Sequence, residues 1–134
     1  MLARLSLALL ATTTPLHAQD AQDVAAGYDI YRSYCIQCHG IDARGDGPMA
    51  ELLAIDTPDL TILSINNGDS FPAEAVAFKI DGRTSLMAHG GEMPIFGEFF
   101  ESDQAVAITL ETGQPMLVSE PLAQIMAYLQ SIQR

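Results

Sequence analysis

The feature that most constrains this chain is Cys35-Ile36-Gln37-Cys38-His39, in which two cysteines are separated by two residues and a histidine follows directly. This spacing lets one tight turn present both thiols to the same edge of a porphyrin, where each thiol can capture a vinyl group as a thioether. The histidine then comes beneath the ring, where its imidazole can bind the iron. The motif therefore predicts one covalently attached haem c, bound through Cys35 and Cys38, with His39 as the proximal iron ligand.

Three other kinds of site contain a Cys-x-x-Cys pair. A zinc ribbon needs a second pair of cysteines, and the chain has only two cysteines in all. A thioredoxin-like redox motif needs a strand followed by a helix, a context that the surrounding sequence does not predict. A small structural disulfide is the third alternative, but neither it nor the redox motif calls for a histidine at the next position.

The N-terminus has the pattern of a signal peptide. Arg4 provides a weak positive region, residues 5–11 form an apolar run too short to span a bilayer, and Leu16-His17-Ala18 is an imperfect cleavage site. A buried N-terminal helix is the alternative, and the break at residues 12–15 argues against it. We expect residues 1–18 to be cleaved and residues 19–134 to form one domain in the periplasm, with no transmembrane anchor.

The charge balance is strongly acidic, with 6 basic and 17 acidic residues and a net charge of −11. This balance argues against nucleic acid and anionic membrane surfaces as partners. It favours a partner that carries a basic patch, or one that docks mainly through apolar contact. The alternative is that the charge only keeps a small protein soluble.

The hydrophobic periodicity predicts a mainly α protein. Longer helices are expected at residues 19–34, 71–81 and 119–133, and short helical turns at 49–55 and 58–67. Gly27 is expected to let the last helix cross the first closely, with Tyr31 and Tyr128 near the crossing. Residues 105–111 and 116–118 flank a turn and predict a short β-hairpin before the last helix.

The second chemical feature is Met93, which is followed by Pro94 in a loop flanked by glycines. A thioether is a soft, neutral ligand that suits low-spin haem iron, and a Met/His ligand pair raises the reduction potential. Met93 is therefore predicted to be the distal iron ligand. Met87 and His89 are the alternatives, and gap-filling in the core is the ordinary role of a methionine.

With these residues in place, the chain resembles a class I c-type cytochrome of the small bacterial monohaem kind. The segments that carry the resemblance cover nearly all of residues 19–134: Gly27 to Tyr31, Cys35 to His39, Gly45 to Pro48, Pro58 to Thr61, Ile80 to Arg83, Met93-Pro94 and Tyr128-Leu129. The resemblance implies helices packed around one haem, a proline carbonyl that orients the haem histidine, here from Pro48, and Met93 as the distal ligand. Two departures are the long segment 104–118 and the absence of a lysine-rich docking face, because Lys79 is the only lysine.

The function that these features predict is that of a soluble periplasmic electron carrier, a monomer and not an enzyme. Its partners would be redox proteins: a membrane oxidase, a cytochrome complex or a periplasmic dehydrogenase. The alternative is a haem-based sensor or small-ligand binder with a labile sixth ligand. A peroxidase is disfavoured because bacterial c-type peroxidases normally carry two haem motifs, and this chain has one.

Overall fold

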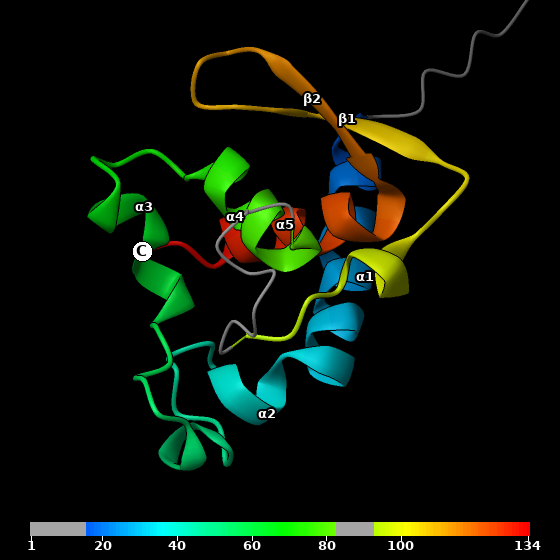
Figure 1. Ribbon diagram of the computed structural model, residues 1–134. Helices are drawn as coiled ribbons and strands as arrows, with labels where there is room; N and C mark the ends of the chain where they lie inside the picture. Colours follow the sequence, from blue (N-terminus) through cyan, green and yellow to red (C-terminus); the bar gives the residue numbers. More distant parts are fainter. Residues whose placement is uncertain (1–15, 83–92) are drawn as a thin grey trace, which may run out of the picture.

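The structure is a computed structural model that describes residues 16–82 and 93–134. Most of the expected signal peptide lies outside these ranges, as do Met87 and His89. The described residues form a mainly α protein with one two-stranded sheet (Figure 1). Within these ranges no helix combines the length and the apolar character needed to cross a membrane.

The fold is organised around the crossing of its first and last helices, α1 (Leu16–Tyr34) and α5 (Glu120–Ser131). Gly27 lies at the crossing, because an added Cβ would meet the backbone of Gln124, with its carbonyl carbon 2.6 Å away, and the Cβ of Tyr128 at 2.9 Å. Tyr31 packs against Tyr128 with ring centroids 5.1 Å apart. The crossing predicted from the sequence is therefore confirmed, although α1 begins three residues earlier than expected.

Short helical turns connect α1 to the middle of the chain. They are α2 (Ile36–His39), η1 (Ala50–Leu52), η2 (Leu60–Ile62) and α3 (Leu63–Asn66). The positions of η1, η2 and α3 agree with the short turns that the sequence predicts at residues 49–55 and 58–67. Figure 1 shows α2 at the end of α1, and α3 on the far side of α4 from α1.

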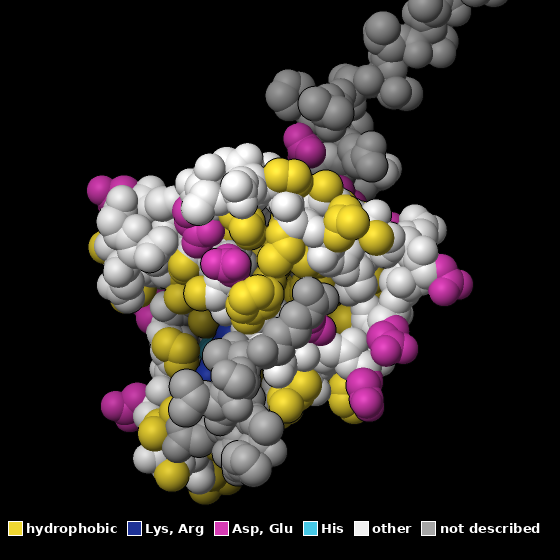
Figure 2. Space-filling view, turned by 45° about the horizontal axis from the view of Figure 1, so that its top comes forward, with side chains coloured by type: hydrophobic (Ala, Val, Ile, Leu, Met, Phe, Trp, Pro, Cys, Tyr) yellow, Lys and Arg dark blue, Asp and Glu magenta, His cyan; other side chains and the backbone are white. Residues whose placement is uncertain are grey.

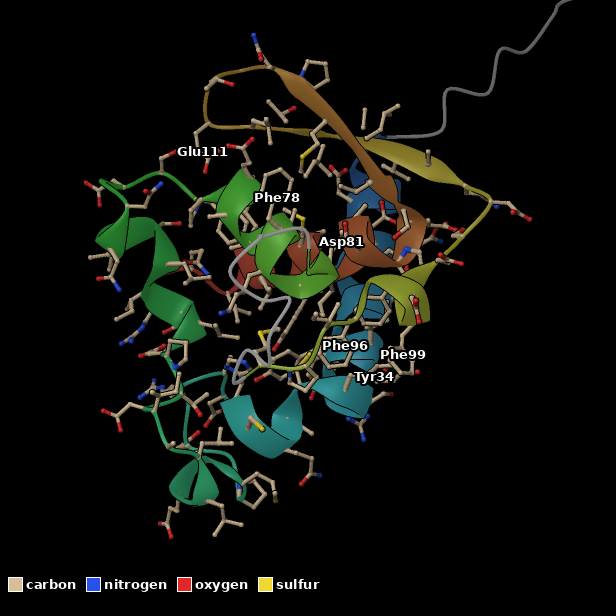
Figure 3. The ribbon with its side chains drawn as sticks, in the orientation of Figure 1. Tyr34, Phe78, Asp81, Phe96, Phe99 and Glu111 are labelled. Carbon is tan, nitrogen blue, oxygen red and sulfur yellow. The ribbon has the colours of Figure 1, made fainter. Side chains whose placement is uncertain are left out.

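Helix α4 (Ala73–Asp81) packs against α5 and ends at Gly82, whose φ of 82° is the left-handed conformation common after helix ends. A 3-10 turn, η4 (Gly97–Phe100), lies against the end of this helix. Phe96, just before η4, and Phe100 within it pack edge-to-face on Tyr34 in the last turn of α1, with ring centroids 6.0 and 5.6 Å from that of Tyr34. Figure 3 shows Phe96 beside Tyr34. Turn η4 is not among the helical segments that the sequence predicts.

Strands β1 (Ala105–Thr109) and β2 (Pro115–Ser119) pair in antiparallel register as the expected hairpin, and they lead directly into α5. Val106 faces Val118, and Ile108 faces Met116 across the pair. This face covers α5, where Val118 is buried, whereas Leu117 on the other face is exposed. A two-stranded hairpin is marginal alone, so its packing on α5 stabilises it.

Helices α4 and α5 supply most of the buried core, and α1, the loop after α2, η4 and the hairpin each add one side chain. Its members are Tyr31, Ala43, Ala73, Ala77, Ile80, Phe100, Val118, Leu122, Ile125, Met126, Tyr128 and Leu129. Cys35 and Met93 are half-buried and pack against this same cluster.

Candidate haem-binding site

The three residues of the predicted attachment motif lie together in one turn that continues α1. The amide of Cys35 donates to the carbonyl of Tyr31 at 2.8 Å, and the amide of His39 donates to the carbonyl of Cys35 at 2.9 Å. The helical hydrogen bonding of α1 therefore passes into α2 through Cys35. This continuity fixes both cysteines and the histidine on a single helical turn at the end of a rigid helix.

Both cysteines are free thiols and half-buried. Burial, and secondarily the neighbouring Cys38, raise the pKa of the Cys35 thiol to about 12, so that it keeps its proton at neutral pH. Redox-active and metal-binding cysteines react as the deprotonated thiolate, and the buried environment of Cys35 disfavours that form. Within the described ranges, no three His, Cys, Asp or Glu side chains are grouped as a metal site would require. The structure thus gives no support to the disulfide, zinc and redox alternatives.

His39 is 8% exposed, and its Nδ1 atom is buried without a hydrogen-bond partner of good geometry among the described residues. Burial lowers the pKa of this imidazole, and hydrogen bonding toward the backbone of Pro58 opposes that effect more weakly. The ring is therefore neutral at pH 7, which is the form that binds a metal.

The proline whose backbone interacts with the His39 imidazole is Pro58, so the prediction that Pro48 has this role is wrong. Pro48 is exposed. The chain returns ten residues later and packs on Gly45, where an added Cβ would lie 3.1 Å from the Pro58 carbonyl oxygen. A backbone acceptor beside the imidazole fixes the ring orientation of a metal-binding histidine.

The loop after His39 is held tightly against the attachment turn. The amide of Gly45 donates to the carbonyl of His39 at 2.9 Å, and the amide of Gly47 to that of Cys38 at 3.1 Å. The hydroxyl of Tyr31, which is fully buried, donates to the carbonyl of Gly40. Through this bond the α1–α5 crossing also positions the start of the loop.

Met93 begins the second described range and is half-buried against the core. The segment after it is anchored to the end of α4: the amide of Phe96 donates to the carbonyl of Ile80 at 2.9 Å. Gly97 packs on Asp81 so closely that a Cβ there would lie 2.6 Å from the Asp81 carbonyl oxygen. Met93 is thus tethered from its C-terminal side to a buried helix.

These residues fit a haem c. Two free thiols and an imidazole lie on one turn, the buried Nδ1 has a backbone acceptor nearby, and a thioether packs on the same core. Figure 2 shows hydrophobic side chains gathered on one face of the molecule, with a small patch of basic side chains among them. Apolar walls and a few converging polar groups are what a buried cofactor requires.

The last two residues clamp the segment that carries Pro58. The side chain of Gln133 donates to the carbonyl of Leu60 at 2.8 Å and accepts from the amide of Ser64 at 2.9 Å. Arg134 donates to Asp59 at 2.9 Å and to the hydroxyl of Thr61 at 2.8 Å. The end of α5 thereby holds η2 and α3 in place.

Replacement of Gln133 by Ala is expected to lower the free energy of unfolding by about 2 kcal/mol, because a half-buried amide and carbonyl lose their partners. Thermal unfolding of the haem-loaded protein measures this loss. Gln130→Ala is the matched control, since Gln130 is an exposed glutamine in the last turn of α5, three residues before Gln133, and should change stability little. Equal effects of the two substitutions would contradict the clamp.

The stability that Asp59 provides is expected to disappear in acid. Its pKa is lowered chiefly by the hydroxyl of Thr61, then by the Thr61 amide and the charges of Arg134 and Arg44. A lowered pKa contributes stability above the unfolded value, and this is lost as the pH falls through the folded value, below about pH 4. The melting temperatures of the wild type and Asp59→Asn should therefore converge between pH 5 and about pH 2.5. A constant difference across this range would contradict the assignment.

Sequence reasoning placed Cys35, Cys38 and His39 together correctly but missed the residues that support them. Pro58 carried a usable signal, since Pro58-Asp59-Leu60-Thr61 was already expected to open a helical segment near the motif. The contacts of Gln133 had no signal in the sequence, because its side chain hydrogen-bonds to two residues that lie 69 and 73 positions earlier in the chain.

The comparison with protein families agrees with this geometry. Residues 22–109 match a family model described as cytochrome C oxidase, cbb3-type, subunit III. The matched range contains the attachment turn, Pro58 and Met93, and it ends at the last residue of β1. No curated protein and no solved structure is similar enough to match the chain.

Proposed function

Because the chain belongs to the family of cytochrome c oxidase, cbb3-type, subunit III, and is thus a c-type cytochrome, we propose that it is a periplasmic electron carrier. Membership supports a haem c and a role in electron transfer. Four residues would hold one haem: Cys35 and Cys38 through thioethers, and His39 and Met93 as axial ligands. When bound, the haem supplies an iron that alternates between the ferrous and ferric states.

The observation that carries the proposal is the buried, neutral imidazole of His39 on the same turn as two free thiols. Nothing else in the described ranges gives these three groups a common purpose, since they form neither a disulfide nor a metal cluster. The neighbouring Pro58 backbone would hold the ring in orientation while the loop 40–49 keeps the turn rigid.

Protein ligands on both faces of the haem would favour electron transfer over catalysis. If His39 and Met93 fill both axial positions, no position remains where a substrate could bind. The half-buried Met93 packs on the core and is tethered to α4, which supports a ligand that stays in place. The redox partners would be a membrane oxidase, a cytochrome complex or a periplasmic dehydrogenase, and export would depend on residues 1–18.

The test is the optical spectrum of the purified haem-loaded protein, oxidised and reduced, with and without carbon monoxide. A sharp low-spin reduced spectrum that carbon monoxide leaves unchanged is the expected result. A shift when the gas is added would show an accessible iron and would favour the haem-sensor alternative. Mass spectrometry of the same sample would show whether one haem is attached and where the signal peptide is cleaved.

A further inference from the structure

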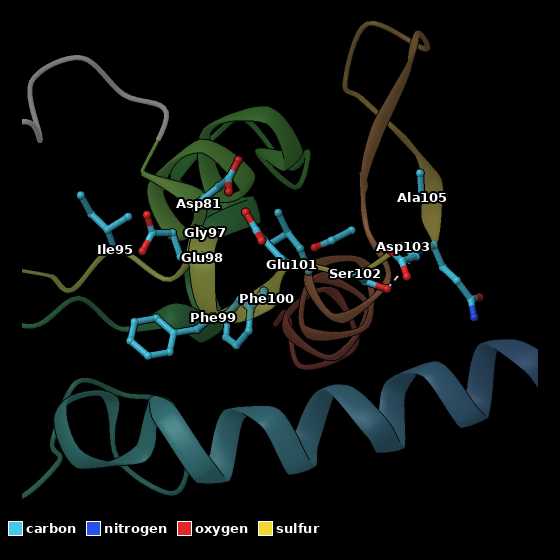
Figure 4. Close-up of a pocket in the computed structure, with 13 residues that line it drawn as sticks. Asp81, Ile95, Gly97, Glu98, Phe99, Phe100, Glu101, Ser102, Asp103 and Ala105 are labelled. Atoms are coloured by element: carbon cyan, nitrogen blue, oxygen red, sulfur yellow. Dashed lines mark hydrogen bonds between the residues drawn. The ribbon is translucent and has the colours of Figure 1, made fainter.

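A groove lies away from the attachment turn, between the end of α4, η4, the start of β1 and α5. Its volume is about 1050 Å³. Figure 4 shows its order: Ile95, Glu98 and Phe99 lie at one end, and Asp103 and Ala105 at the other. The groove is open, so a surface of another protein can reach it.

The described side chains that line this groove carry charge of one sign. Four carboxylates line it, from Asp81, Glu98, Glu101 and Asp103, and the last three side chains are exposed. None of the described residues that line it is a lysine or an arginine. Such a surface attracts a cationic partner and repels an anionic one.

An exposed aromatic ring lies beside these carboxylates. Phe99 is 72% exposed and Ile95 is 44% exposed, and both of these large apolar side chains line the groove. Phenylalanine is enriched at the centres of protein interfaces, whereas an acidic surface that only maintains solubility has no need of it. The combination of an apolar anchor and a carboxylate rim indicates a protein partner in place of a metal ion.

Phe99 is also presented on a rigid base. Its ring lies 6.2 Å from that of Phe96, which stacks on the buried Phe100 at 5.5 Å, and both of these contact Tyr34 of α1 (Figure 3). A side chain that is already fixed loses little entropy when a partner binds it. The same segment begins at Met93, so a partner here would contact the stretch that carries the predicted distal ligand.

We propose that this groove docks a basic face of a redox partner protein, with lysine or arginine side chains against Glu98, Glu101 and Asp103 and an apolar side chain against Phe99. The partner's redox character rests on the proposed function, whereas its basic and apolar chemistry rests on the groove. A partner could instead dock beside the two cysteines. The exposed Leu52 of η1 lies in the loop that follows the motif and marks that other surface.

The test uses the haem-loaded protein and a lysine-rich mitochondrial cytochrome c as a basic redox probe. Stopped-flow mixing gives the second-order rate of electron transfer at low and high salt. Phe99→Ala is expected to lower this rate about tenfold. Leu52→Ala is the matched control, because Leu52 is 74% exposed and Phe99 72%, and it should leave the rate within about twofold.

The charge contribution is tested with two triple variants of equal charge change. E98Q/E101Q/D103N should lower the low-salt rate about tenfold. D20N/D29N/E74Q, which lies outside the groove lining, should lower it by less than about threefold. Equal effects of the two triples would mean steering by total charge alone and would overturn the proposal, as would a larger effect of Leu52→Ala than of Phe99→Ala.

Binding is measured separately by NMR shift mapping with both proteins oxidised, so that no electron passes. Shifts concentrated at residues 95–105 would support the docking site even if electron transfer to the probe failed, in which case only the proposed function would fall. Rapid transfer that the groove variants leave unchanged would keep the function and overturn the docking site.

Discussion

Met93→Ala is expected to lower the reduction potential of the haem-loaded protein by roughly 0.2 V, within the wide range that axial ligands set. A neutral, soft thioether favours the ferrous state, so its loss favours the ferric state. The variant should also bind carbon monoxide, because alanine leaves the sixth position without a protein ligand. Potentiometric titration and the reduced spectrum with the gas measure both effects.

The control for this substitution is Met116→Ala. Met116, on β2, is a half-buried methionine that packs against the same core as Met93. Its loss should cost stability through packing and leave the potential unchanged. If Met93→Ala keeps both the wild-type potential and resistance to carbon monoxide, the distal ligand is another residue. Met87 and His89 would then be the first to replace, and both lie outside the described residues.

Helices α4 and α5 were predictable because each has an apolar face that repeats with helical period. The last helix shows this best: Leu122, Ile125 and Leu129 recur at helical spacing, and all three are buried. The glycine at position 27 added a tertiary prediction, since a missing side chain on that face invites close approach. The hairpin followed from two β-prone runs separated by Gly113, which has a φ of 79°.

The attachment turn was predictable for a different reason, since covalent chemistry demands a fixed local spacing. What supports that turn was not local. The identity of the proline near His39 depends on how a loop of some twenty residues folds back, and the nearer Pro48 was the wrong choice. A single turn such as η4 is too short to show a hydrophobic period, so the exposure of Phe99 had no signal in the sequence.

Gly27→Ala is expected to destabilise the protein by about 3 kcal/mol, near the upper end of overpacking effects. The added methyl group would overlap the carbonyl group of Gln124 and lie 2.9 Å from the Cβ of Tyr128. Alanine favours a helix over glycine by about 1 kcal/mol, which offsets part of the cost. Denaturant unfolding of the haem-loaded protein measures the net change, and Ala25→Ser, at an exposed position of α1, should change it little.

The cause of this destabilisation can be separated from a side-chain clash. Because the nearest atoms belong to the backbone of Gln124, shortening that side chain in Gly27→Ala/Gln124→Ala should not restore stability. Helices α1 and α5 would have to move apart, and this would disturb Tyr31. The ring of Tyr31 packs on Tyr128, and its hydroxyl donates to the carbonyl of Gly40 at the start of the loop 40–49. A wild-type unfolding free energy for Gly27→Ala would contradict the close crossing. A loss of stability with an altered haem spectrum would show that this crossing also positions the attachment turn.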